Sequence, residues 1–195
     1  GGLALFDLEW DNIKAGQAWV AAQSIDADEE IVRLGIGYPI TGANILLIRQ
    51  HPRERIRWLE AALVAAKRLK DRANEGYALG NLGITYVDLG EIKRAIQFHE
   101  QELTIVRELK DRRNEGNALG SLGNAYKNLG ETKRAIQFYE QALIIVREIG
   151  YRRGEGNALW NMSLALGQLG ERARSAHRRV RPRRARSSRS GQDPS

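Results

Sequence analysis

The side chains with the clearest chemistry in this sequence are amides that recur at matching positions of a 40-residue period. Asn157 lies one period after Asn117, and Asn161 lies one period after Ser121. An amide donates and accepts hydrogen bonds at once, which suits the backbone of an extended peptide; a polar face that only contacts water is the alternative. The predicted binding face comprises Tyr77, Asn81, Ile84, Asn117, Ser121, Asn124, Asn128, Asn157, Asn161 and Leu164.

Catalytic and metal-binding constellations find little support in the sequence. His51, His99 and His177 lie in separate predicted elements, and none has a second ligand at metal-binding spacing. There is no cysteine, which excludes disulfides and thiolate ligands. The glycine-containing segment at residues 35–42 is no phosphate loop, because no predicted strand precedes it and it does not end in Gly-Lys-Ser/Thr. We therefore expect no enzyme activity, no cofactor and no metal, and we assign His99 to helix packing.

An internal repeat must position the amides. Residues 71–110 and 111–150 are identical at 27 of 40 positions, and the pattern continues for half a period beyond residue 150. Self-similarity at a fixed period is typical of stacked repeats, in which each unit buries its apolar face against the next. The repeat therefore predicts an all-α fold, a right-handed α-solenoid of antiparallel helix pairs with about nine or ten helices.

Each period contains two amphipathic helices. Asp111 is a predicted N-cap for the first, and Gly130 is a predicted left-handed terminator. Gly123 is small where the two helices must approach closely, whereas Gly80 and Gly120 are less constrained and keep the binding face open. The predicted core positions are Leu119, Leu122, Tyr126 and Leu129 in the first helix, and Ala135, Ile136, Tyr139, Ala142, Leu143 and Val146 in the second.

These residues resemble the tetratricopeptide repeat (TPR). Its signature is met by Leu122, Gly123, Tyr126, Ala135, Tyr139 and Ala142. The preceding copy departs from it at His99 and Glu102. In TPR relatives the first-helix face lines a concave groove that binds a protein or peptide segment. The resemblance thus implies a protein–protein interaction scaffold.

Two further segments, residues 8–19 and 49–63, resemble the helical region of bacterial signalling NTPases of the NB-ARC or STAND type. This resemblance implies that the chain is the sensor arm of a larger protein. Its partners would then include an upstream NTPase domain of the same full-length chain. The chain begins with Gly1 and Gly2 rather than Met, which is consistent with a fragment.

The sequence predicts six successive regions. They are an N-terminal helical pair at 1–38, a degenerate first repeat at 39–70, repeats at 71–110 and 111–150, an incomplete repeat at 151–177 and a disordered Arg-rich tail at 178–195. Within the first two regions we expect helices at 3–23, 28–37, 41–50 and 52–70, with a turn at 24–28 and a break at Pro39. The expected core positions of the N-terminal helix are Leu5, Leu8, Ile13, Ala15, Ala18 and Trp19.

The net charge of +7 is confined to the C-terminal end. Residues 171–195 hold nine Arg against two acidic residues, whereas residues 1–170 hold 22 basic and 22 acidic residues. A nucleic-acid-binding module that acts through this tail is the alternative function, but no Tyr, Phe or Trp follows Trp160 for stacking on bases. No apolar run approaches the roughly 18 residues of a membrane span. We expect a cytoplasmic protein without membrane or nucleic-acid partners.

The last predicted first-helix has lost its partner. Its packing stripe comprises Leu159, Met162, Leu166 and Leu169. Beyond Gly170 the apolar pattern ends and Pro182 interrupts it, which suggests a frameshift or truncated gene product. We expect a short helix over residues 171–179 to cover part of the stripe, and the rest to stay exposed and prone to self-association.

Overall fold

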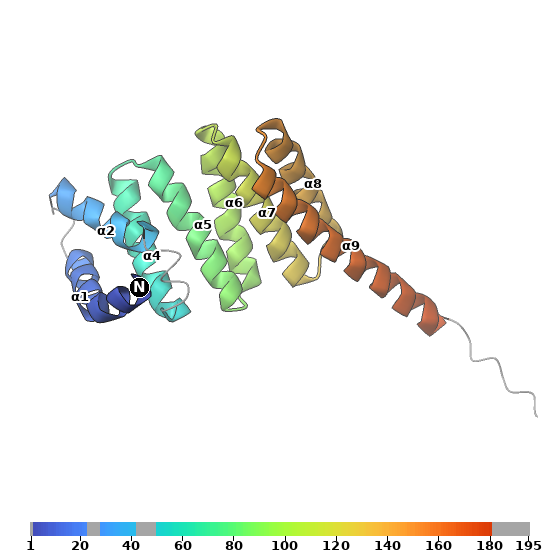
Figure 1. The fold of residues 1–195 in the computed structure, drawn as a ribbon, viewed down its shortest axis with the longest axis horizontal. Coiled ribbons are helices and arrows are strands. Elements are labelled where there is room, and N and C mark those ends of the chain that lie inside the picture. The colour runs from blue at the N-terminus through green and yellow to red at the C-terminus, as the bar shows by residue number, and fades with distance from the viewer. Residues whose placement is uncertain (1, 23–27, 42–49, 181–195) are drawn as a thin grey trace, which may run out of the picture.

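The computed structural model describes residues 2–22, 28–41 and 50–180, and every regular element within these ranges is a helix (Figure 1). The helices are α1 Gly2–Ala22, α2 Glu29–Thr41, α4 Pro52–Arg68, α5 Arg72–Asp88, α6 Ile92–Glu108, α7 Arg112–Leu129, α8 Thr132–Glu148 and α9 Arg152–Val180. Each helix packs mainly against its neighbours in sequence, and the helices from α4 to α9 form a row of antiparallel helices. The predicted all-α solenoid is confirmed.

The turns between helices repeat with the period of the sequence. Asp111 caps α7 as predicted, because its carboxylate accepts the backbone N–H of Asn114 at 3.0 Å. Gly130 ends α7 at a φ of 89°, in the left-handed region that glycine adopts without strain. At the matching turns after α4, α6 and α8, Lys70, Lys110 and Gly150 also adopt the left-handed region, with φ of 53°, 56° and 67°. The turn geometry is therefore conserved between repeats even where the residue does not favour it.

The predicted stripes of α7 and α8 form the main core. Buried members are Ala118, Leu119, Leu122, Ala125, Tyr126, Ala135, Tyr139, Ala142 and Leu143. Tyr126 and Phe138 stack with ring centroids 5.2 Å apart, and Tyr86 and Phe98 repeat this contact at the same distance one period earlier. His99 is buried, so its assignment to helix packing is confirmed.

Glycines let the two helices of each repeat approach closely. A Cβ added at Gly123 would lie 2.7 Å from Cδ1 of the Tyr139 ring, and one at Gly83 would lie 2.5 Å from Cε1 of His99. Gly120 faces open space, as predicted, with nothing within 4 Å of an added Cβ. The prediction for Gly80 is wrong: an added Cβ there would lie 2.6 Å from Oε1 of Glu102. The long side chain of Glu102 occupies this space.

The N-terminal helices differ from the sequence prediction in two respects. α2 continues through Pro39 to Thr41 instead of ending before the proline. Pro39 has no N–H to donate to the carbonyl of Gly35, which is a cost inside a helix, and its ring is buried. In α1 the predicted core residues Leu8 and Trp19 are exposed. Trp10, which is half-buried, instead packs against Trp58 of α4, with ring centroids 5.8 Å apart and the rings tilted by 34°.

Other N-terminal predictions meet the structure as follows. Ala15 and Ala18 are exposed as well, and Ile13 is half-buried. α4 begins at Pro52 as predicted. The predicted turn at 24–28 and helix at 41–50 lie almost wholly outside the described residues, as does the part of the predicted tail from residue 181 on. The predicted start of the tail at residue 178 is wrong, because residues 178–180 belong to α9.

The C-terminal helix is longer than the repeat predicts. α9 runs without interruption from Arg152 to Val180, so the predicted stop near Gly170 and the separate covering helix are wrong. The residues after Gly170 are rich in Arg and offer few apolar side chains to pack back onto the solenoid. They therefore extend the existing helix, and Figure 1 shows its end leading away from the stack. Leu159, Trp160 and Leu166 remain exposed on α9.

Candidate ligand-binding groove

The predicted binding face lies on the first helices of the repeats, α5, α7 and α9. Neighbouring first helices contact each other, with the second helices α6 and α8 packed against them. None of the ten predicted residues is buried. The helix periodicity that buries Leu119 and Leu122 in the core turns Asn117 and Asn124 to the opposite side.

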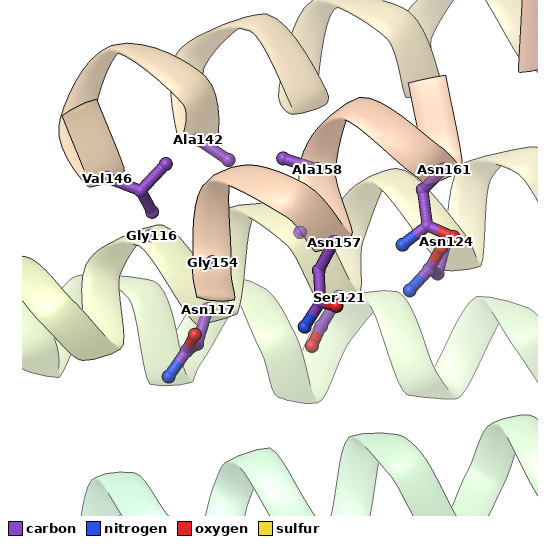
Figure 2. Close-up of a pocket in the computed structure, with 11 residues that line it drawn as sticks. Gly116, Asn117, Ser121, Asn124, Ala142, Val146, Gly154, Asn157, Ala158 and Asn161 are labelled. Atoms are coloured by element: carbon purple, nitrogen blue, oxygen red, sulfur yellow. The ribbon is translucent and has the colours of Figure 1, made fainter. Parts of the chain in front are cut away.

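Five of the predicted residues line one hollow between α7, α8 and α9, with a volume of about 230 Å³ (Figure 2). The hollow is lined by Gly116, Asn117, Gly120, Ser121, Asn124, Ala142, Val146, Gly154, Asn157, Ala158 and Asn161. In the view of Figure 2 the side chains of Asn157 and Ser121 overlap, as do those of Asn161 and Asn124, and all four line the hollow. The other predicted residues, Tyr77, Asn81, Ile84, Asn128 and Leu164, lie outside this hollow.

Sequence reasoning missed the floor of the hollow. Gly116, Gly154 and Ala158 carry no polar group, and Ala142 and Val146 were assigned to the core. The signal that could have found them is the substitution of Glu102 by Ala142 between the two repeats, which removes a large side chain from the second helix. Small residues become a site only when nothing else fills the space beside them.

The amides are held to different degrees. Asn124 Oδ1 accepts a hydrogen bond of 2.8 Å from the Tyr139 hydroxyl, which leaves its Nδ2 available to a ligand. Asn117 Nδ2 donates to Asn114 Oδ1 at 3.3 Å. Within the described residues, the side chains of Asn157 and Asn161 form no hydrogen bond, so they too are available to a ligand.

The hollow is electrically neutral, since no Asp, Glu, Lys, Arg or His contributes to its lining. Burial raises the pKa of Tyr139 to about 12, so the phenol stays protonated and keeps donating to Asn124 at physiological pH. In the described part of the chain, no group of three or more His, Asp or Glu is placed to hold a metal ion. No helix there is long and apolar enough to cross a membrane.

At the equivalent place in the preceding repeat, side chains of the described residues occupy the space. There Glu102 lies beside Gly80, and its Oε2 is 2.9 Å from Nδ1 of His99. Tyr77 reaches across to α7, where its hydroxyl accepts a 3.3 Å hydrogen bond from Asn114 Nδ2. Asn81 is engaged by its own helix, because its Nδ2 donates to the Tyr77 carbonyl at 2.9 Å. The first-helix face is thus closed at α5 and open at α7 and α9.

Comparison with protein families identifies the repeat. Residues 78–113 and 118–150 match the model of the tetratricopeptide repeat. No curated protein sequence matches the chain.

Three solved structures with a similar fold illustrate the match. The chain matches the TPR domain of Arabidopsis FLU at 24% identity with a TM-score of 0.56, over 60% of this chain and 98% of that one. It matches BtubC from P. vanneervenii at 16% identity with a TM-score of 0.68, over 99% and 85%.

The third structure is a STAND protein (Signal Transduction ATPase with Numerous Domains) with a tetratricopeptide repeat sensor, from Pyrococcus horikoshii. It matches at 18% identity with a TM-score of 0.63, over 71% of this chain and 21% of that one. The present chain thus spans about a fifth of the length of that protein. Together the family match and these folds support a protein–protein interaction scaffold.

Proposed function

We propose that this chain of tetratricopeptide repeats is a protein–protein interaction scaffold that binds an extended segment of its partner across α7 and α9. The observation that carries the proposal is the hollow in Figure 2, where amides from two successive repeats meet. Asn117 and Asn157 occupy the same position of their repeats, as do Ser121 and Asn161. A ligand that runs from one repeat to the next therefore meets an amide at the first position twice, and a hydroxyl followed by an amide at the second.

An extended backbone fits this spacing. Packed helices lie about 10 Å apart, which corresponds to about three residues of an extended chain at ~3.3 Å each. Each amide can accept from a backbone N–H and donate to a backbone C=O, so the contacts do not depend on the ligand's side chains. The amides sit on packed helices rather than loops, and the Tyr139 hydroxyl fixes Asn124, which reduces the entropy lost on binding.

The wider role we propose is that of a sensor arm. It is supported by the likeness in fold to the STAND protein from P. horikoshii and by the resemblance of residues 8–19 and 49–63 to NTPase-linked helical regions. In such a protein, ligand binding at α7 and α9 would change the contacts between the solenoid and an NTPase domain. Replacing the amide side chains of the hollow by alanine in the full-length protein should then abolish the effect of the ligand on ATP hydrolysis and leave hydrolysis without ligand unchanged.

The binding experiment uses linear peptides selected on the protein from a random phage-displayed library. The test variant carries Asn117→Ala, Asn157→Ala and Asn161→Ala. Asn124 is left in place because its loss would also strand the buried Tyr139 hydroxyl. At about 1 kcal/mol per hydrogen bond and tenfold per 1.4 kcal/mol, we expect affinity to fall about 100-fold.

The matched control removes three exposed amides of the second helices, Gln97, Gln101 and Gln137, which do not line the hollow. Its affinity for the same peptides, measured by fluorescence anisotropy, should stay within about twofold of wild type. Equal affinities of the test and control variants would show that the first-helix amides are only a solvated surface.

A further inference from the structure

Two consecutive repeats of nearly the same sequence differ at one cluster of positions, and this cluster decides whether the binding face is open. In the α5–α6 repeat, the carboxylate of Glu102 fills the space beside Gly80. In the α7–α8 repeat, Ala142 stands in place of Glu102, and nothing lies within 4 Å of a Cβ added at Gly120. Removing one carboxylate side chain thus leaves the hollow.

The hydrogen bonds of the neighbouring side chains change in step. His99 bonds to Glu102, and the residue facing the binding side is Ile84, which offers no acceptor. One repeat later, Tyr139 replaces His99 and reaches past the hollow to Asn124, which replaces Ile84. The buried polar side chain has a hydrogen-bond partner in both repeats. His99 bonds to Glu102, which fills the binding side, whereas Tyr139 bonds to Asn124, which lines the hollow.

From this contrast we propose that the hollow is a side-chain pocket for one uncharged, apolar residue of the bound segment. The proposal rests on the function proposed above and names the chemistry of the ligand. The floor is formed by Gly120, Ala142, Val146 and Ala158 together with the Gly116 backbone, which offers apolar contact without a counter-charge. A charged side chain would lose its hydration there and gain no ionic partner. The rim amides bind the backbone on either side of the anchored residue.

The closed repeat sets the register of the ligand. Because Glu102 and Tyr77 occupy the equivalent space one repeat earlier, the same ligand finds no second pocket about three residues away. The protein therefore selects an apolar side chain at one position of the ligand and contacts only the ligand backbone elsewhere. Residue 142, with its counterpart 102, acts as the specificity-determining position.

The test uses the phage-displayed linear peptide library on the wild-type protein and on variants. We expect the selected peptides to share one fixed apolar residue, and exchange of that residue for Asp to weaken binding at least tenfold, since a buried apolar side chain contributes about 1.5–3 kcal/mol. Ala142→Glu copies the closed repeat and should cause a similar loss. Gly120→Leu fills the hollow from α7 and serves as a second variant, because an unpaired carboxylate could disturb folding.

The matched control is Gly156→Leu. Gly156 lies on α9, faces open space and does not line the hollow, so the same substitution should leave binding within about twofold. A gain-of-function variant carries Glu102→Ala, His99→Tyr, Ile84→Asn and Tyr77→Asn, which places the residues of the open repeat at the matching positions of the α5–α6 repeat. Selection on it should reveal a second apolar preference about three residues from the first.

The outcomes separate the two proposals. If peptides bind and the amide variant weakens them, but Ala142→Glu and Gly120→Leu bind as well as wild type, the pocket is refuted and the scaffold function stands. A charged residue fixed at the anchor position also refutes it. If no peptide is enriched on the folded wild-type protein, the proposed function fails and the pocket fails with it.

Discussion

Alanine at Gly123 and at Gly120 should change stability in opposite directions, although the two glycines are three residues apart on the same helix. Alanine is the better helix former by about 1 kcal/mol in either position. At Gly120 nothing opposes this gain, because an added Cβ meets no atom within 4 Å. We expect Gly120→Ala to raise the free energy of unfolding by about 0.5–1 kcal/mol.

At Gly123 the same methyl group collides with the Tyr139 ring, whose Cδ1 would lie 2.7 Å from it. Overpacking of this kind costs about 1–3 kcal/mol. Displacing the ring also weakens the 2.8 Å hydrogen bond from Tyr139 to Asn124, a further loss of about 1 kcal/mol. These costs exceed the gain in helix propensity, so Gly123→Ala should lower the free energy of unfolding by about 2 kcal/mol.

Urea titration followed by circular dichroism at 222 nm measures both variants against wild type. The corresponding thermal midpoints should fall by about 4–8 °C for Gly123→Ala and rise by about 1–4 °C for Gly120→Ala. Gly83→Ala, which meets the His99 ring, should behave like Gly123→Ala. A Gly123→Ala protein as stable as wild type, or equal destabilisation by both alanines, would refute the assignment of close packing to Gly123 and open space to Gly120.

Four further predictions follow from single contacts. Asp71→Ala should lower the free energy of unfolding by about 1 kcal/mol at pH 7. Hydrogen bonds from Asn74 lower the pKa of Asp71, so the stabilisation is present above the pKa of the unfolded carboxyl and is lost as the pH falls through the folded value. Denaturation curves that show the same difference from wild type at pH 7 and at pH 2 would contradict this. Burial raises the pKa of Tyr139 to about 12, so the contribution of this phenol to stability is present below pH ~10 and lost as the pH rises to 12. Tyr139→Phe should therefore remove a late phenolate titration near pH 12. Completion of all phenolate titration in the wild type by pH 11 would contradict this. Lys110→Gly should stabilise the chain by about 0.5 kcal/mol because Lys110 holds a φ of 56°, a position that is glycine one period later; a loss of stability in urea titration would show that the Lys side chain matters more than the strain. Hydrogen exchange should be faster at residues 157–169 of α9 than at residues 118–129 of α7. Trp160 is 67% exposed on a side that no described helix covers, so Trp160→Glu should reduce self-association measured by sedimentation. Equal protection of the two segments in a strictly monomeric wild type would refute both expectations.

The likeness of successive periods limits what one repeat reveals about the other. Residues 71–110 and 111–150 share 27 of 40 positions and adopt the same pair of helices. Their binding sides nonetheless differ, because Glu102 occupies a volume that Ala142 leaves empty. Five of the predicted residues line the hollow, whereas the side chains of Tyr77 and Asn81 bond within the closed repeat, and a binding role for the face stays a prediction.

The sequence by itself determined the local structure of the repeats. The apolar spacing, the Asp111 cap and the Gly130 terminator act over one or two helical turns, so the all-α solenoid and the core stripes of α7 and α8 could be predicted. It could not determine how far α9 continues, because a turn after Gly170 forms only if the following residues can bury apolar side chains against a neighbouring helix. Nor could it determine which side of α1 is buried, because that depends on how α1 packs against α2 and α4. The hollow belongs to the same class: it is a difference in volume between three packed helices, and only their packing shows that the space beside Gly120 is left unfilled.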